Sequence, residues 1–213
     1  MKNIYYTYYG KETMELFAPK IERSLGKAAR GLYLECPAVK DFNKNVFTVF
    51  SPFNIKFVFN RETNNIHITG DNVLIKAQYA SDGSAEIQFY PQLIFRSDEK
   101  VMLQLLPPVL TNVVHQGYVP TGEYDISKWL RPVHAALIVP NTVNELEIKE
   151  GDALFSLRFV SDDSVKLVKK ELTEQEHKLA KACEGVSDVK RGNKLETLYR
   201  LFDIMKGKRC PFR

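Results

Sequence analysis

The chain has 213 residues, of which 44% are hydrophobic and 26% charged, a composition typical of a folded domain rather than a disordered chain. It contains no apolar run of roughly 18 residues, the length that a membrane-spanning helix requires, so we expect no membrane partner. The start, MKNIYYTYYGKE, lacks the basic and apolar regions of a signal peptide, and the three widely spaced cysteines favour a reducing cytoplasm with free thiols.

The amino-terminal part predicts strands after an irregular start. Residues 1–30 have no clean period, and we expect an irregular N-terminal segment there with a short helical turn. Residues 31–38 (GLYLECPA) predict a short strand that ends at Pro37. Residues 45–60 have an apolar period of two that is interrupted at Pro52, which predicts two strands around a kink or a bulged strand.

The middle of the chain predicts further strands separated by turns. NRETNN and TGDN have turn compositions, and SDGS (81–84) is a strong hairpin signal between two strands. Residues 134–140 (HAALIVP) predict a buried strand, and KEGD (149–152) predicts a turn between two more. Residues 31–170 therefore predict a mainly β body, an antiparallel β-sandwich or barrel of about ten strands.

From residue 171 the pattern becomes helical. Thr173 followed by Glu176 is a capping-box pattern that starts a helix, and Gly185 predicts its end. A second helix repeats this logic with Asn193, Glu196 and Gly207 at the corresponding positions. We expect residues 171–213 to form a helical appendage of two helices, and their apolar stripe favours packing on the body.

The carboxyl-terminal segment is basic. Residues 190–213 contain eight basic and two acidic residues, a net charge of +6 against +4 for the whole chain. Such a tail attracts phosphates or an acidic partner, so one hypothesis is nucleic-acid binding. The candidate contact residues are Arg191, Lys194, Arg200, Lys208 and Arg209. The alternative is a helix face that is simply solvated.

Several chemistries find no support in the motifs. The chain has no glycine-rich phosphate loop and no cysteine pair with zinc spacing, and its four histidines are far apart, so we predict neither a metal site nor a cofactor. A nucleophile–histidine–acid set can be assembled from Cys36, His134 and Asp125, but their spacing does not support it. No catalytic residues are therefore assigned.

The densest group of functional residue types is DISKWLRPVHA (125–135). Trp129 offers a flat apolar surface with one N–H donor, and Arg131 a planar fork suited to carboxylate or phosphate. Pro132 favours an extended backbone at Arg131, which aims its side chain. His134 is the residue type here that changes charge near neutral pH.

Two interpretations of this stretch remain open. The first is a ligand-binding patch in which Trp129 stacks on a base or ring while Arg131 and Lys128 hold an anion, with Asp125 and His134 beside them. The second is a corner of a β-sandwich in which Trp129 belongs to the core and Arg131 pairs with Asp125.

Two resemblances to known families occur. ELEIKEGDALFSLRF (145–159) is similar to a hairpin of the dUTPase and dCTP-deaminase barrels, in which an I-x-x-G-D turn precedes a strand, although the nucleotide motifs of that family are not found. CPAVKDFNKNVFTVFSPFNIKF (36–57), DISKWLRPVHAAL (125–137) and EGDALFSLRFVSDDSVKLV (150–168) resemble uncharacterised proteins of large tailed bacteriophages, mostly T-even-like and marine phages. This second resemblance implies expression in the cytoplasm of an infected bacterium, or a place in the virion.

The sequence favours a non-enzymatic, β-rich interaction or binding protein of a bacteriophage, with a host or phage protein as its partner. One alternative is a nucleotide-binding β-barrel, with or without hydrolysis, that uses Trp129, Arg131 and His134. The other is a nucleic-acid-binding protein that acts through the basic tail. Because a sheet must pair or cover its edge strands, a homo-oligomer is also expected.

Overall fold

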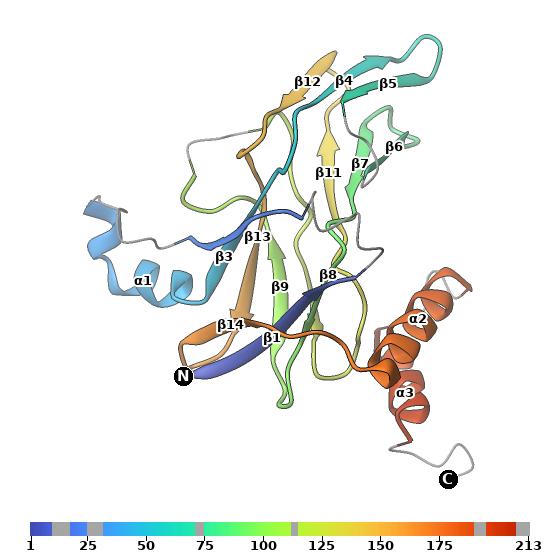
Figure 1. Cartoon of the computed structure of the whole chain (residues 1–213). Helices are drawn as coiled ribbons and strands as arrows, with labels where there is room; N and C mark the ends of the chain where they lie inside the picture. The colour runs from blue at the N-terminus through green and yellow to red at the C-terminus, as the bar shows by residue number, and fades with distance from the viewer. Residues whose placement is uncertain (10–17, 25–31, 71–74, 112–114, 190–194, 208–213) are drawn as a thin grey trace.

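The computed structural model describes residues 1–9, 18–24, 32–70, 75–111, 115–189 and 195–207, which form 14 strands and three α-helices (Figure 1). The first strands are β1 (Lys2–Tyr8), β2 (Ile21–Arg23), β3 (Val46–Phe50), β4 (Ile55–Asn60), β5 (Asn65–Gly70), β6 (Ile75–Tyr79) and β7 (Ala85–Phe89). The others are β8 (Leu93–Arg96), β9 (Met102–Leu106), β10 (Gly122–Asp125), β11 (Ala135–Val139), β12 (Glu145–Ile148), β13 (Ala153–Val160) and β14 (Val165–Lys169). The helices are α1 (Pro37–Asn43), α2 (Glu174–Val189) and α3 (Leu195–Met205).

One layer of the fold is built on two long, bent segments, each made of two strands that follow one another in the chain. β3 continues into β4 across residues 51–54, and β12 continues into β13 across residues 149–152. The bends are joined, because the Ser51 N–H donates to the Asp152 carbonyl at 2.8 Å. The strand orders are β10-β9-β13-β3-β2 below the bend and β12-β4-β5 above it. The kink predicted at Pro52 is confirmed.

The second layer has the strand orders β11-β7-β6 and β14-β1-β8. β1 lies in the middle of its sheet, parallel to β14 and antiparallel to β8. Residues 2–8, which we expected in an irregular segment, are therefore a central strand. The prediction of a mainly β fold with two carboxyl-terminal helices is confirmed, as a sandwich rather than a closed barrel and with more strands than the ten expected.

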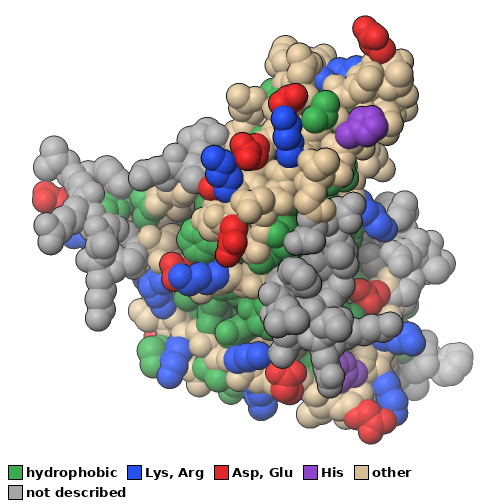
Figure 2. Space-filling view, turned by 45° about the horizontal axis from the view of Figure 1, so that its top comes forward, with side chains coloured by type: hydrophobic (Ala, Val, Ile, Leu, Met, Phe, Trp, Pro, Cys, Tyr) green, Lys and Arg blue, Asp and Glu red, His purple; other side chains and the backbone are tan. Residues whose placement is uncertain are grey.

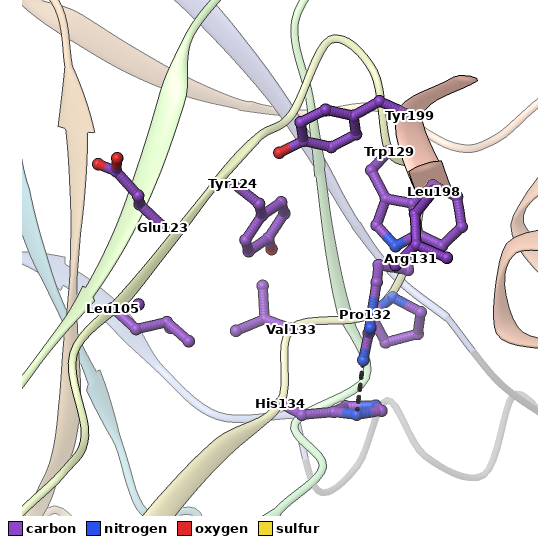
Figure 3. A pocket seen from close by; sticks show the side chains of 11 residues that line it. Leu105, Glu123, Tyr124, Trp129, Arg131, Pro132, Val133, His134, Leu198 and Tyr199 are labelled. Carbon is purple, nitrogen blue, oxygen red and sulfur yellow. Dashed lines mark hydrogen bonds between the residues drawn. The ribbon is translucent and has the colours of Figure 1, made fainter. Parts of the chain in front are cut away.

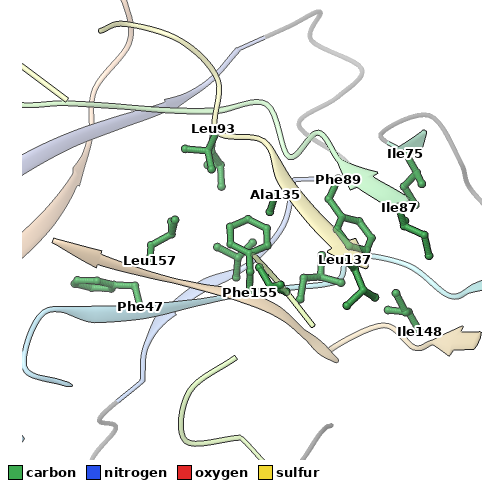
Figure 4. Packing of buried hydrophobic residues seen from close by; sticks show 14 of the residues in the cluster. Phe47, Ile75, Ile87, Phe89, Leu93, Ala135, Leu137, Ile148, Phe155 and Leu157 are labelled. Carbon is green, nitrogen blue, oxygen red and sulfur yellow. The ribbon is translucent and has the colours of Figure 1, made fainter. Parts of the chain in front are cut away.

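The two layers enclose one large apolar core (Figure 4). Alternation places Ile55, Phe57 and Phe59 of β4 inside, whereas Lys56 and Asn60 between and after them are exposed. Figure 4 shows apolar side chains from β7, β11 and β13 gathered between the strands. This core holds the scaffold on which the connection between β10 and β11 is displayed.

The helices α2 and α3 pack on the body through a second, smaller apolar cluster. Its buried members are Ile94, Trp129, Leu130, Leu172, Ala180, Cys183 and Phe202. The predicted capping box is confirmed, because the Thr173 N–H donates to Glu176 Oε2 at 2.8 Å and the Glu176 N–H donates to Thr173 Oγ1 at 3.3 Å. Glu176 also forms an ion pair with Arg96 of β8, which ties the start of α2 to the sheet.

Two local predictions are wrong. The predicted strand at 31–38 is a 3₁₀ turn (Leu32–Glu35) followed by α1, because Pro37 stands in the first turn of that helix, where its missing N–H costs nothing. Gly185 does not end α2, which continues through it. A glycine costs a helix about 1 kcal/mol, which the burial of Ala180 and Cys183 on the same helix offsets.

The surface carries charges of both signs. On the face shown in Figure 2, Lys and Arg side chains are interspersed with Asp and Glu side chains rather than gathered into one basic area. Across the ranges that the structure describes, no helix is long and apolar enough to cross a membrane. The outer strand β5 presents alternating exposed side chains, of which His67 is one.

Candidate functional site

A pocket of about 220 Å³ lies where the body meets α3 (Figure 3). Its walls come from β9, β10, the connection between β10 and β11, and α3. The lining residues are Leu105, Gly122, Glu123, Tyr124, Trp129, Arg131, Pro132, Val133, His134, Leu198 and Tyr199. We call this site the Trp129 pocket.

The connection that carries most of the lining begins with a turn at Asp125. One carboxylate oxygen of Asp125 accepts hydrogen bonds from the Ser127 N–H at 2.9 Å and the Ser127 hydroxyl at 2.6 Å. The Lys128 N–H donates to the Asp125 carbonyl at 3.1 Å, which closes the turn. Further along, the Val133 N–H donates to the Leu93 carbonyl at 2.7 Å. The two anchors fix the backbone on either side of Trp129.

The indole of Trp129 is buried between the body and α3. The residue is 3% exposed, and its ring lies 6.2 Å from the ring of Phe202, measured between centroids. Its Nε1 is buried and has no hydrogen-bond partner among the described residues. An indole N–H only donates, and burying it without an acceptor costs about 1–3 kcal/mol. The pocket therefore contains one donor that the protein does not satisfy.

Tyr124 brings a second polar atom of this kind. Part of the residue is exposed, but its hydroxyl oxygen is buried and has no hydrogen-bond partner among the described residues. Burial raises the pKa of Tyr124, and the nearby Arg131 guanidinium opposes this shift only in part. The hydroxyl thus stays protonated at physiological pH and is able to donate.

Arg131 and His134 form a polar pair on the other wall. An Nη2 of Arg131 lies 3.1 Å from Nδ1 of His134, as the dashed line in Figure 3 marks. Because a guanidinium only donates, Nδ1 accepts, and the proton of the neutral imidazole sits on Nε2. The ring of Tyr90 packs edge-on against His134 with centroids 4.6 Å apart. The pair is thereby held in one orientation.

Two further polar lining groups, Glu123 and Tyr199, each accept one hydrogen bond from within the protein. Glu123 is exposed, and its carboxylate accepts a hydrogen bond from Gln104 at 3.0 Å. The Tyr199 hydroxyl accepts from the Asp125 N–H at 2.6 Å and so pins α3 to the turn. Burial raises the pKa of Tyr199. Both contacts fix the wall of the pocket in place.

The arrangement is suited to binding. Its lining combines apolar walls with residues that carry hydrogen-bond donors, Trp129, Tyr124 and Arg131, the usual composition of a ligand pocket. No serine, cysteine, threonine or lysine is among the described residues that line it. A histidine is present, but its Nδ1 is occupied by Arg131.

The structure brings three of the five predicted ligand residues together. Trp129, Arg131 and His134 line the pocket, whereas Lys128 is exposed on the turn and does not line it. Asp125 is buried and structures the turn. The predicted Arg131–Asp125 pair is not formed, because Ser127 is the partner of that carboxylate. Trp129 agrees with both interpretations of this stretch, because it belongs to the smaller apolar cluster and also lines the pocket.

The other predicted sites are placed less completely. Arg200 is exposed on α3, while Arg191, Lys194, Lys208 and Arg209 lie outside the described residues. Nucleic-acid binding through these residues stays a prediction. Cys36 is exposed at the start of α1, and α1 lies on the opposite side of the molecule from α2 and α3 (Figure 1). Within the described ranges, His, Cys, Asp and Glu side chains form no group that could hold a metal ion.

Sequence reasoning missed Tyr124, Leu198 and Tyr199. Tyr124 directly precedes the predicted stretch, but only the structure reveals that its hydroxyl is unpaired. Leu198 and Tyr199 belong to the apolar stripe of the second predicted helix, which does pack on the body and also forms part of the pocket wall.

Comparison with known proteins gives no further constraint. No protein-family model matches the chain, and no curated protein is significantly similar to it.

Proposed function

We propose that the protein is a non-enzymatic binding protein that holds a small ligand in the Trp129 pocket. The observation that carries this proposal is the pair of buried, unpaired polar atoms, Trp129 Nε1 and Tyr124 Oη, in one pocket. Each such atom costs the free protein about 1–3 kcal/mol, so two in one pocket are expected where a ligand provides the missing acceptors.

The size of the pocket favours a small ligand over a nucleotide. Its volume of about 220 Å³ lies below the roughly 300 Å³ at which pockets for drug-sized ligands begin. Arg131 is the one cationic side chain among the described lining residues, whereas a nucleoside triphosphate brings several negative charges. We therefore place the nucleotide-binding alternative second. The resemblance to bacteriophage proteins makes the cytoplasm of an infected bacterium the proposed setting.

Trp129 is the single tryptophan of the chain, so its emission reports on the pocket directly. The test is to add size-fractionated small molecules from a bacterial lysate and to follow Trp129 emission and melting temperature. A ligand at a hundredfold excess over its Kd adds about 2.7 kcal/mol, or roughly 5–10 °C for a chain of this size. We expect at least one fraction to change both signals.

The matched pair of variants is Tyr124→Phe and Tyr79→Phe. Tyr124→Phe removes the unpaired hydroxyl and should abolish or weaken the response. Tyr79 lies on β6, where its hydroxyl bonds the Asn65 carbonyl at 3.2 Å, and its variant should respond like the wild type. If no fraction changes the emission or the melting temperature of the wild-type protein, the proposal is overturned.

A further inference from the structure

We infer that the ligand of the Trp129 pocket is a small carboxylic acid with an apolar body, bound with its carboxylate on Trp129 Nε1 and Tyr124 Oη beside the Arg131 guanidinium. This inference rests on the proposed function and names the chemical class of its ligand.

The first argument is the direction of the hydrogen bonds. Trp129 Nε1 and the nitrogens of Arg131 only donate, and burial keeps Tyr124 protonated and therefore able to donate. A carboxylate is acceptor-only and takes up to about four hydrogen bonds. An ammonium group, which only donates, finds no acceptor on Trp129 Nε1 or Arg131. A primary amide offers one acceptor oxygen where a carboxylate offers two, so it serves fewer of these donors at once.

The second argument is charge. Among the described lining residues, Arg131 is the one with a fixed positive charge. Glu123 is the one acid among them, and it is exposed and bonded to Gln104. A monoanion is balanced by one guanidinium, whereas a phosphate monoester carries about −1.5 to −2 at neutral pH. Burying that excess charge is costly without a second cation. The charge of the pocket therefore favours a carboxylate over a phosphate.

The third argument is the shape and chemistry of the walls. Leu105, Pro132, Val133 and Leu198 are apolar, and Trp129 adds an aromatic face (Figure 3). The acid must therefore carry an apolar group that these walls remove from water. A volume of about 220 Å³ admits an aryl or branched aliphatic acid but not a long fatty acyl chain.

The test is isothermal titration of the full-length protein with four probes that share one aromatic ring. The probes are phenylacetate, phenylacetamide, phenethylamine and phenyl phosphate. We expect phenylacetate to bind at least about tenfold more tightly than any of the other three, because only its head group matches the donors in number and charge.

The variants Tyr124→Phe and Trp129→Phe should each weaken phenylacetate binding by about tenfold to a hundredfold, the value of one hydrogen bond to a charged group. Tyr79→Phe should leave it unchanged. Circular-dichroism melting shows whether each variant is folded. If Trp129→Phe does not fold, the result for Tyr124→Phe alone tests the inference.

The outcomes separate this inference from the proposed function. If the amide, the amine or the phosphate binds as tightly as the acid and Tyr124→Phe weakens it, the carboxylate assignment is overturned and the binding function stands. If a peptide ending in a phenylalanine carboxylate binds more tightly than phenylacetate, the inference that the ligand is a small free acid is overturned. If none of the probes and no lysate fraction binds, both proposals are overturned.

Discussion

Tyr124 and Tyr199 show that the same hydroxyl group has opposite effects depending on its partner. Both residues line the Trp129 pocket. The Tyr199 hydroxyl accepts a hydrogen bond from the Asp125 N–H at 2.6 Å, whereas the Tyr124 hydroxyl is buried without a partner among the described residues. A buried polar group stabilises the fold only when it is paired, so the two hydroxyls should contribute to the free energy of unfolding with opposite signs.

We therefore predict that removing the hydroxyl group has opposite effects on the free energy of unfolding at these two positions. Tyr124→Phe should raise the free energy of unfolding of the ligand-free protein by about 1 kcal/mol, because it removes an unpaired buried hydroxyl. Tyr199→Phe should lower it by about 1 kcal/mol or more, because it leaves the Asp125 N–H unpaired. Urea unfolding followed by circular dichroism measures both. Destabilisation by Tyr124→Phe equal to that of Tyr199→Phe would contradict the assignment.

At the residue scale, the site was only partly predictable. Trp129, Arg131 and His134 stand close together in the sequence and share the pocket, so residue type and spacing were enough to single them out. Asp125 was assigned to ligand binding, but its carboxylate is used by Ser127 two residues later. Whether a polar side chain is paired depends on its neighbours in space. For that reason the unpaired hydroxyl of Tyr124 was not predictable.

At the scale of the elements, α2 is tied to the body by the first residues of the helix. One carboxylate oxygen of Glu176 accepts from the Thr173 N–H and hydroxyl, while the other forms the ion pair with Arg96. The side chains of Arg96 and Glu176 are 14% and 29% exposed, so solvent screens this pair less than an ordinary surface pair. Glu176 thus serves the cap and the docking contact together.

This double use predicts unequal costs at the two capping positions. Thr173→Ala should lower the free energy of unfolding by about 1 kcal/mol, the usual value of a cap. Glu176→Ala should cost more, because it removes the cap and also leaves the partly buried guanidinium of Arg96 without this carboxylate. Glu174→Ala is the control, since the partner of Glu174 among the described residues is the exposed Lys178 on the same helix. Equal costs for Thr173→Ala and Glu176→Ala in chemical denaturation would show that the Arg96 pair contributes nothing.

The prediction of strands and helices succeeded where local sequence signals determine the element, and it failed where tertiary packing determines it. The period of two in β4 and the capping box at Thr173 are local signals, and both are confirmed. β1 escaped prediction because it is covered on both faces, with Ile4 in the main core and Thr7 buried on the other side, so its sequence does not alternate cleanly. The helix through Gly185 likewise depends on tertiary packing that no local pattern contains.

At the scale of the whole molecule, the sheet order depends on contacts between distant parts of the chain. β1 pairs in parallel with β14, so the first strand is held by the last one. Periodicity predicts that strands exist and which residues they bury, but it contains no information on which strands pair. The class of the fold was therefore predictable, whereas the two bent sheets and the meeting of α3 with the β10–β11 connection were not.

The junction between the body and the two helices gathers several groups with raised pKa values. Burial raises the pKa of the Cys183 thiol to about 11, and burial also raises the pKa of Tyr9, Tyr124 and Tyr199. All four groups are neutral when protonated. Between the ordinary and the raised pKa, the unfolded chain has released a proton that the folded chain keeps. The free energy of unfolding must therefore fall as pH rises through this window.

The junction should accordingly make the protein sensitive to alkali. The contribution is fully present below pH 9.0, the ordinary pKa of a cysteine, and we expect it to be lost progressively as pH rises toward about 11. Urea unfolding at a series of pH values, followed by circular dichroism because tyrosinate quenches tryptophan emission, measures this loss. Cys183→Ala should make the decline shallower, since one titrating group is gone, while it lowers stability at neutral pH by leaving a small cavity. A free energy of unfolding that stays constant from pH 9 to 11 in the wild-type protein would mean that these groups are not buried at the junction, and the packing of α2 and α3 on the body would then have to be revised.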